Sequence, residues 1–191
     1  MKVSHFFALC AASFFAVGGV ARAQVAPAAN GGGRPIGMSV GISDFSIDYG
    51  HDRRMLGPVA RGGIDLFHGL GVEGSARSIF MFTPDKVTRM QQSVFEGGAF
   101  YEAPGFHGVH FFANGGVGLG LIEFPSNNPK YTRDTYTVFQ GGGGFEFHMV
   151  QRAYLRAEYT YQSWRDFLGP NQLTPQGETL GVTYYLNRRP R

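Results

Sequence analysis

The chain is poor in cysteine, in long apolar runs and in net charge. Cys10 is the single cysteine among 191 residues, so no internal disulfide can form and the fold must be held by backbone pairing and packing. After the first two dozen residues, no apolar run approaches the roughly 20 residues of a membrane-spanning helix. No long amphipathic helical pattern is present either. The composition therefore argues against a disulfide scaffold and against a helical membrane protein.

The N-terminus has the features of a secretory signal peptide. Lys2 supplies the positive charge, residues 6–20 form the apolar segment, and Ala21-Arg22-Ala23 is a small-residue cleavage site. We predict cleavage after Ala23, which removes residues 1–23 and Cys10 with them. The remaining 168 residues suffice for one domain.

The charge balance gives little support to a nucleic-acid partner. Loss of the leader removes Lys2 and Arg22, which lowers the count of Lys and Arg from 17 to 15 against 14 acidic residues. Much of the remaining basic character lies in the tail, residues 188–191. We therefore expect no nucleic-acid partner.

Glycine and aromatic residues are abundant, and they follow an alternating pattern that is clearest in residues 141–164. Phe145 and Phe147 fall on one face and Glu146 on the other, and after a break at 148–152 the alternation resumes up to Trp164. A period of two predicts a β-hairpin with one apolar and one charged face.

The same alternation predicts eight strands between residues 38 and 187, after an Ala-, Gly- and Pro-rich segment, 24–37, that we expect to be disordered. In the first strand Val40 and Ile42 lie in one phase and Phe45 in the other, so we predict a bulge near Ser43 and Asp44. The strands are predicted at 38–49, 58–67, 70–78, 90–102, 108–122, 135–147, 153–164 and 176–187.

The predicted connections alternate strictly between long and short. Short turns are expected at 68–69, 103–107 and 148–152, and long connections at 50–57, 79–89, 123–134 and 165–175. This segregation is typical of a transmembrane barrel, whose short turns lie in the periplasm and whose long loops lie outside. The fold class predicted is all-β: an eight-stranded antiparallel up-and-down transmembrane β-barrel. A soluble, lipocalin-like exported barrel is the alternative, and it would need a polar outer face.

Aromatic residues cluster at the predicted strand ends, as expected of girdles at the two membrane interfaces. The predicted girdle residues are Tyr49, Phe80, Phe82, Phe124, Tyr136 and Trp164 beside the long loops, and Phe67, Phe106, Phe147 and Tyr154 beside the short turns.

Three features together resemble the small opacity-type outer-membrane β-barrels related to the transmembrane domain of outer-membrane protein A. They are the signal peptide, the strand pair containing residues 142–147 and 155–159, and the final strand ending Tyr184-Tyr185-Leu186. The resemblance implies an outer-membrane location, contact with outer-membrane lipids and lipopolysaccharide, insertion by the outer-membrane assembly machinery, and no cofactor. Such barrels usually end on an aromatic residue, whereas here five residues follow Leu186.

Charged residues on the opposite phase from the apolar face are expected inside the barrel. Because an eight-stranded barrel has room only for side chains or one small ligand, and because buried charges must be paired, we predict a charge network filling the lumen. A gated pore or a proton-linked site is the alternative. The predicted network is Arg61, Asp65, Glu73, Arg77, Glu96, Glu146, Arg156 and Glu158.

Other chemistries have weaker support. Lipid-modifying enzymes occur among eight-stranded barrels, but Ser163 has no histidine nearby in sequence, and His110 is remote from it. His68, His107 and His148 fall near the predicted periplasmic turns without a spacing typical of metal ligands. We expect no catalytic, metal or cofactor site.

The predicted function is therefore a structural or surface-interaction role carried by the extracellular loops. Pairs of basic residues in those loops, such as Arg53-Arg54, suit anionic lipopolysaccharide headgroups. A small pore and a lipid-modifying outer-membrane enzyme are the alternatives.

Overall fold

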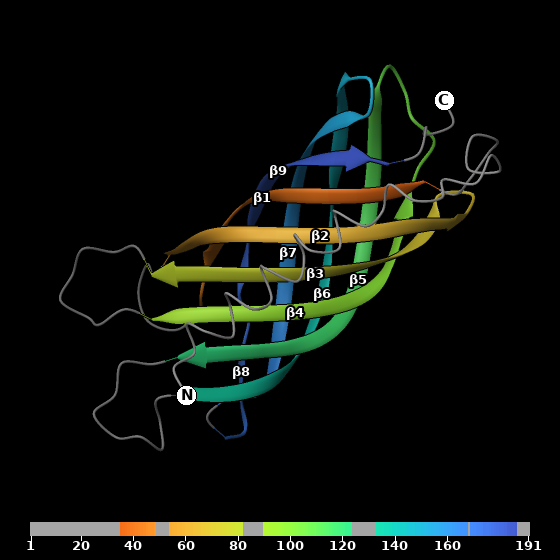
Figure 1. Cartoon of the computed structure of the whole chain (residues 1–191). Coiled ribbons are helices and arrows are strands. Elements are labelled where there is room, and N and C mark those ends of the chain that lie inside the picture. Colours follow the sequence, from red (N-terminus) through yellow and green to blue (C-terminus); the bar gives the residue numbers. More distant parts are fainter. Residues whose placement is uncertain (1–34, 49–53, 82–89, 124–132, 168, 187–191) are drawn as a thin grey trace, which may run out of the picture. The chain divides into compact units, whose positions relative to one another are not determined.

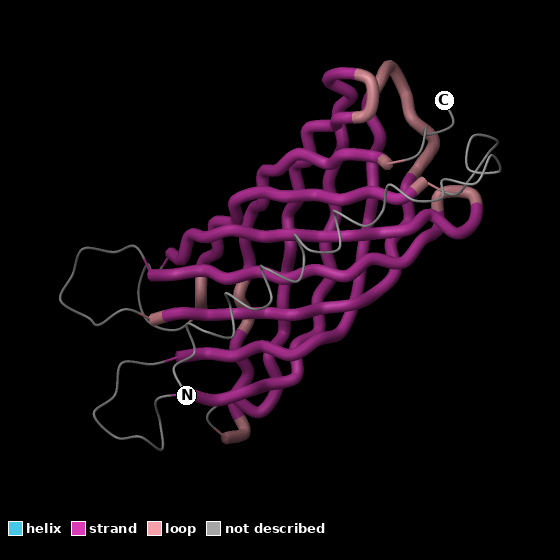
Figure 2. Tube along the Cα trace, viewed as in Figure 1, coloured by secondary structure: helices cyan, strands magenta, loops and turns pink. Residues whose placement is uncertain are grey.

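The computed structural model describes residues 35–48, 54–81, 90–123, 133–167 and 169–186. Almost all of these residues lie in strands, as Figure 2 shows. Within these ranges no helix is long and apolar enough to cross a membrane. The strands are β1 (Ile36–Ser46), β2 (Arg54–Phe67), β3 (Leu70–Met81), β4 (Gln91–Glu102), β5 (Val109–Glu123), β6 (Arg133–Val150), β7 (Ala153–Phe167), β8 (Asn171–Leu173) and β9 (Gln176–Tyr185).

Eight of these strands close into an antiparallel barrel (Figure 1). Neighbours in sequence pair from β1 to β7, and β9 then pairs with both β7 and β1. The short β8 stands apart from this ring and pairs only with the end of β7. Closure leaves no unpaired edge along the barrel wall, which is what a bilayer requires of spanning strands. The predicted fold class is confirmed.

The short turns adopt the conformations that their residues favour. His68 and Gly69, between β2 and β3, have φ of 48° and 82°, and His107 and Gly108 have φ of 51° and 80°. Positive φ at both central residues is the type I′ geometry that matches the twist of a hairpin, and glycine adopts it without steric cost. The three short turns lie at one end of the barrel, and the strand ends that precede and follow the longer connections lie at the other, which we call the long-loop end.

Several strands are longer than the sequence predicted. β2 begins at Arg54, inside the predicted connection 50–57, because pairing with β1 continues through Gly57 and Pro58. The proline nitrogen has no hydrogen to donate, and the β2–β3 pairing is indeed interrupted between Leu56 and Val59. β3 extends to Met81, and the predicted connection 165–175 contains the end of β7 and all of β8.

The bulge predicted near Ser43 and Asp44 is wrong. β1 pairs with β2 from Ile36 to Ser46 and with β9 from Gly37 to Ser46 without a register shift. Phe45 simply points inward, where it is fully buried, while Val40 and Ile42 point outward. The two phases of β1 are both apolar because the barrel interior changes character along its axis.

At the long-loop end the interior is apolar. This apolar cluster consists of Phe45, Ile47, Met55, Ile79, Met90, Val94, Ile122, Tyr136, Val138, Trp164, Phe167 and Leu173. Val94 of β4 belongs to this cluster and faces inward. The cluster explains why apolar residues occupy inward positions in several strands.

The aromatic girdle prediction is partly wrong for the same reason. Tyr136 and Trp164 are buried in the apolar cluster, and Tyr154 is buried at the short-turn end. Phe67, Phe80, Phe106 and Phe147 are exposed, as predicted. Tyr49, Phe82 and Phe124 lie outside the described residues, as do the predicted leader, residues 24–34 of the predicted lead-in and the basic tail.

Candidate functional site

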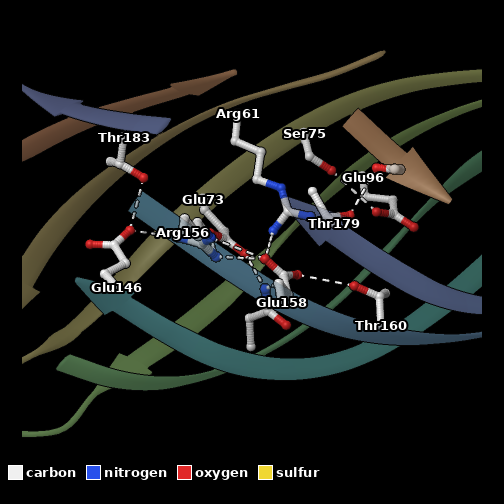
Figure 3. A network of polar contacts seen from close by, with 12 residues as sticks. Arg61, Glu73, Ser75, Glu96, Glu146, Arg156, Glu158, Thr160, Thr179 and Thr183 are labelled. Carbon is white, nitrogen blue, oxygen red and sulfur yellow. Dashed lines mark hydrogen bonds and ion pairs between the residues drawn. The ribbon is translucent and has the colours of Figure 1, made fainter. Parts of the chain in front are cut away.

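The middle of the lumen is occupied by a network of buried charges (Figure 3). Arg156 of β7 is its centre. Its Nη2 lies 3.0 Å from Glu158 Oε2 and 3.4 Å from Glu73 Oε2, and its Nη1 lies 3.3 Å from Glu146 Oε1. The guanidinium also lies over the ring of Phe112, 3.8 Å from its centroid. One arginine thus forms ion pairs with carboxylates from three strands.

Glu158 lies beside Arg156 and is the acceptor for the largest number of donors. Its Oε2 forms an ion pair with Arg61 Nη1, and its Oε1 accepts hydrogen bonds from Asn114 Nδ2 at 3.0 Å and Thr160 Oγ1 at 3.1 Å. Asn114 Nδ2 also donates to Glu73 at 2.7 Å. A carboxylate that accepts several charged and neutral donors can remain ionised although it is buried.

Glu146 connects this centre to the last strand. Thr183 Oγ1 donates to its Oε1 at 2.9 Å, and Tyr185 Oη donates to its Oε2 at 2.8 Å. Sequence reasoning missed Tyr185, because it follows Tyr184 on the outward phase and a run of two tyrosines does not say which one faces inward. Asn114 and Thr183 were on the inward phase, but their role as bridges between carboxylates depends on contacts across the barrel.

Arg77 and Glu96 form a second group, closer to the long-loop end. Their Nη2 and Oε2 atoms are 3.9 Å apart, and the Arg77 guanidinium lies 4.2 Å from the ring centroid of Phe45. Glu96 also accepts hydrogen bonds from Ser75 at 3.2 Å and from Gln162 at 2.5 Å. This group forms the border between the charged network and the apolar cluster.

Asp65 stands apart from the other predicted network residues. Among the described residues no ion pair or side-chain hydrogen bond joins it to the other seven. It lines a small cavity of about 40 Å³ at the short-turn end, together with Glu73, Arg156 and Tyr185. This volume holds a few water molecules and no larger ligand. Near the same end, His110 Nδ1 lies 2.9 Å from Glu102 Oε1, an inward acid that the sequence analysis did not include.

Trp164 joins the polar and apolar parts of the lumen. Its Nε1 donates to Gln162 Oε1 at 3.2 Å, while its ring lies in the apolar cluster and is fully buried. Gly120 of β5 faces the ring, and a Cβ at that position would overlap the indole. The glycine is therefore required for the tryptophan to lie across the lumen, and the ring closes the lumen above the charged network.

The two candidate catalytic residues lie far apart in the fold. Ser163 points outward near the end of β7, where its Oγ accepts a hydrogen bond from Gln172 at 2.6 Å. His110 lies at the other end of the barrel beside Glu102 and within ring-contact distance of Tyr154. Among the described residues no group of three or more His, Cys, Asp or Glu side chains has the geometry to hold a metal ion.

The outer wall is apolar between the short turns and the ends of the long strands. Every barrel strand carries at least one large apolar side chain that is two-fifths exposed or more. Examples are Val40, Phe95, Phe111, Leu119, Phe139, Phe145, Tyr161 and Leu180. So much exposed apolar surface on one continuous wall marks contact with a membrane. The soluble alternative, which needs a polar outer face, is wrong.

Solved structures of outer-membrane barrels share this fold. The Neisserial surface protein A matches over 80% of this chain and 97% of its own, with 12% identity and a TM-score of 0.64. Ail, the attachment invasion locus protein of Yersinia pestis, matches over 81% and 100%, with 16% identity and a TM-score of 0.60. OprG of Pseudomonas aeruginosa matches over 81% and 97%, with 13% identity and a TM-score of 0.55.

No curated protein sequence matches the chain. The family model described as the outer membrane protein beta-barrel domain matches residues 7–185, nearly the whole chain. The chain belongs to this family, and it is a β-barrel protein of the bacterial outer membrane.

Proposed function

We propose that the protein is a closed, non-conducting barrel that serves as a scaffold for interactions at the cell surface, with lipopolysaccharide as its partner in the outer leaflet. The observation that carries the proposal is the filling of the lumen. Charges are paired across the middle of the barrel, and the apolar cluster fills its extracellular end. On this proposal the seven predicted network residues other than Asp65 are structural, and they hold opposite walls together.

A small pore is the strongest competing function. Ions would have to pass the fully buried Trp164 and the apolar side chains of the cluster around it, which cannot replace an ion's hydration shell. We expect the purified, folded barrel to produce no conductance steps in planar lipid bilayers. Reproducible steps of uniform size would contradict the proposal and make the pore the leading function.

A lipid-modifying enzyme is the other alternative. The separation of Ser163 from His110, with the barrel wall between them, argues against a shared catalytic site. We expect that overexpression leaves the mass spectrum of extracted lipid A unchanged. A new lipid A species that disappears in the Ser163→Ala variant would overturn this part of the proposal.

The surface-interaction role is supported by the names of solved structures that have a similar fold. One is named as a surface protein and another as an attachment invasion locus protein, and a structure of the latter holds the heparin analogue sucrose octasulfate. At such low identity these names support an interaction role without specifying the partner.

The lipopolysaccharide partnership has a direct thermodynamic test. A ligand that binds only the folded barrel raises its stability as the ligand concentration rises. We expect the temperature at which the folded form is lost, followed by gel migration of heated samples, to rise with added lipopolysaccharide and not with added neutral detergent.

We further propose that export follows cleavage after Ala23 and that the outer-membrane assembly machinery inserts the barrel. Protein sequencing of the mature N-terminus should begin at Gln24. A protein retained with its first 23 residues in the outer membrane would contradict the cleavage proposal.

A further inference from the structure

One arginine on the outer wall is held in place without an ion pair to any carboxylate in the described part of the chain. Arg165 follows the inward-facing Trp164 on β7, so its side chain points outward, where it is exposed. Its guanidinium carbon lies 4.7 Å from the ring centroid of Phe139 on β6. A cation–π contact of this kind keeps the guanidinium against the wall.

The absence of an acidic partner distinguishes Arg165 from the other outward arginine near this end. Arg54 on β2 forms two hydrogen bonds to Asp44, with its Nη2 2.7 Å from the carboxylate. Among the described residues no ion pair involves Arg165. Its charge and most of its donors are therefore available to an anionic group from outside the protein.

The surroundings of Arg165 divide into a polar part and an apolar part. Toward the extracellular end, Gln172 of β8 lies beside Arg165, because Trp164 pairs with Leu173. Gln172 donates to Ser163, which pairs with Phe139 in the β6–β7 ladder. Toward the middle of the membrane the wall continues with exposed large side chains of β7, among them Tyr161 and Tyr159. We name this region, consisting of Phe139, Tyr161, Ser163, Arg165 and Gln172, the β6–β7 rim.

We propose that the β6–β7 rim binds lipid A, with a lipid A phosphate held by Arg165. A lipid in the outer leaflet has its apolar and polar parts in the same order as the rim. Its acyl chains lie level with the apolar wall, and its phosphates lie at the interface. Arginine binds phosphate with two parallel hydrogen bonds, and Phe139 orients the guanidinium for that contact. The amide and hydroxyl of Gln172 and Ser163 lie where the sugar headgroup would be.

This inference rests on the proposed partnership with lipopolysaccharide and assigns it a site. The test is native mass spectrometry of the folded full-length mature barrel in detergent, titrated with bisphosphorylated lipid A and, separately, with lipid A from which both phosphates have been removed. The variants are Arg165→Gln and Arg165→Lys, and the matched control is Arg152→Gln, which removes an exposed arginine at the short-turn end of the barrel, where its Nη1 donates to the backbone carbonyl of Leu186.

We expect the wild type to bind the phosphorylated lipid more tightly than the dephosphorylated one. Arg165→Gln should weaken binding of the phosphorylated lipid by on the order of tenfold, the effect of losing one charge-assisted contact, and should leave binding of the dephosphorylated lipid unchanged. Arg165→Lys should keep part of the preference, and Arg152→Gln all of it. Because Arg165 is exposed, the variants should fold, and heat-dependent gel migration checks that they do.

The other outcomes separate this inference from the proposed function. If the wild type prefers the phosphorylated lipid and Arg165→Gln does so equally, the phosphate is bound elsewhere and the assigned site is wrong, while the partnership stands. If the wild type binds both lipids equally, phosphate recognition is wrong. If the wild type binds neither, the partnership itself fails.

Discussion

Replacement of Arg156 by methionine tests whether the lumen charges stabilise one another and are shielded from water. The substitution keeps much of the side-chain volume and the contact with Phe112 but removes the cation that lies within 3.4 Å of Glu73, Glu146 and Glu158. Glu158 retains Arg61 and Glu146 retains its hydroxyl donors, whereas Glu73 keeps only Asn114 among the partners described above.

The expected loss of stability is large because one partner of a buried ion pair is removed while its acids stay. Breaking such a pair costs about 3–5 kcal/mol, which lowers the folding equilibrium constant by roughly two to four powers of ten. We expect a matching fall in the urea concentration at which the barrel unfolds in lipid vesicles, followed by gel migration of unheated samples. A double variant, Arg156→Met with Glu73→Gln, should recover part of the loss because it removes the carboxylate with the fewest other donors.

Arg54→Gln serves as the control for the stability measurement. Arg54→Gln breaks a salt bridge on the exposed outer surface, so its unfolding midpoint should stay close to that of the wild type. If Arg156→Met unfolds at the same urea concentration as Arg54→Gln, the lumen charges are solvated by water. The interpretation of the lumen as a filled, coupled network would then be wrong.

Three further substitutions, two of them with a control substitution, test the lumen closure and the turns. Gly120→Leu should displace the Trp164 ring and shift its fluorescence to longer wavelength, whereas Gly97→Ala, which has no atom within 4 Å of the added Cβ, should not. Trp164→Ala should cost about 3–5 kcal/mol in urea unfolding because it leaves a cavity in a packed interior. His68→Val should cost roughly 1–2 kcal/mol, since a β-branched residue is strained at φ of 48°, whereas His68→Asn should be tolerated.

The strand architecture could be predicted because it depends on local alternation. Phe145 and Phe147 opposite Glu146 define two faces whatever surrounds them, and the His68-Gly69 turn is set by the conformations of two residues. The same alternation of side chains along each strand predicted that the charged residues face the lumen. Strand ends were less predictable, because Arg54 joins β2 only through pairing with β1.

The contents of the lumen could not be predicted in full, since they depend on which side chains meet across the barrel. Alternation separates two faces but does not identify the one that contacts lipid. The sequence therefore predicted a bulge to explain the phase of Phe45, and it predicted a membrane girdle position for Trp164. Both side chains lie in the apolar cluster instead. Tyr185 reaches Glu146 from a strand 39 residues further along the chain, a contact that no local pattern indicates.

The claim that the extracellular end of the lumen is sealed has a direct spectroscopic test. The chain contains a single tryptophan, Trp164, and it is fully buried at the centre of the seal. Fluorescence of the folded barrel in lipid vesicles should therefore be blue-shifted, and iodide added on the loop side should not quench it. Strong quenching by iodide, approaching that of the urea-unfolded chain, would mean that ions reach the middle of the lumen and would contradict the account.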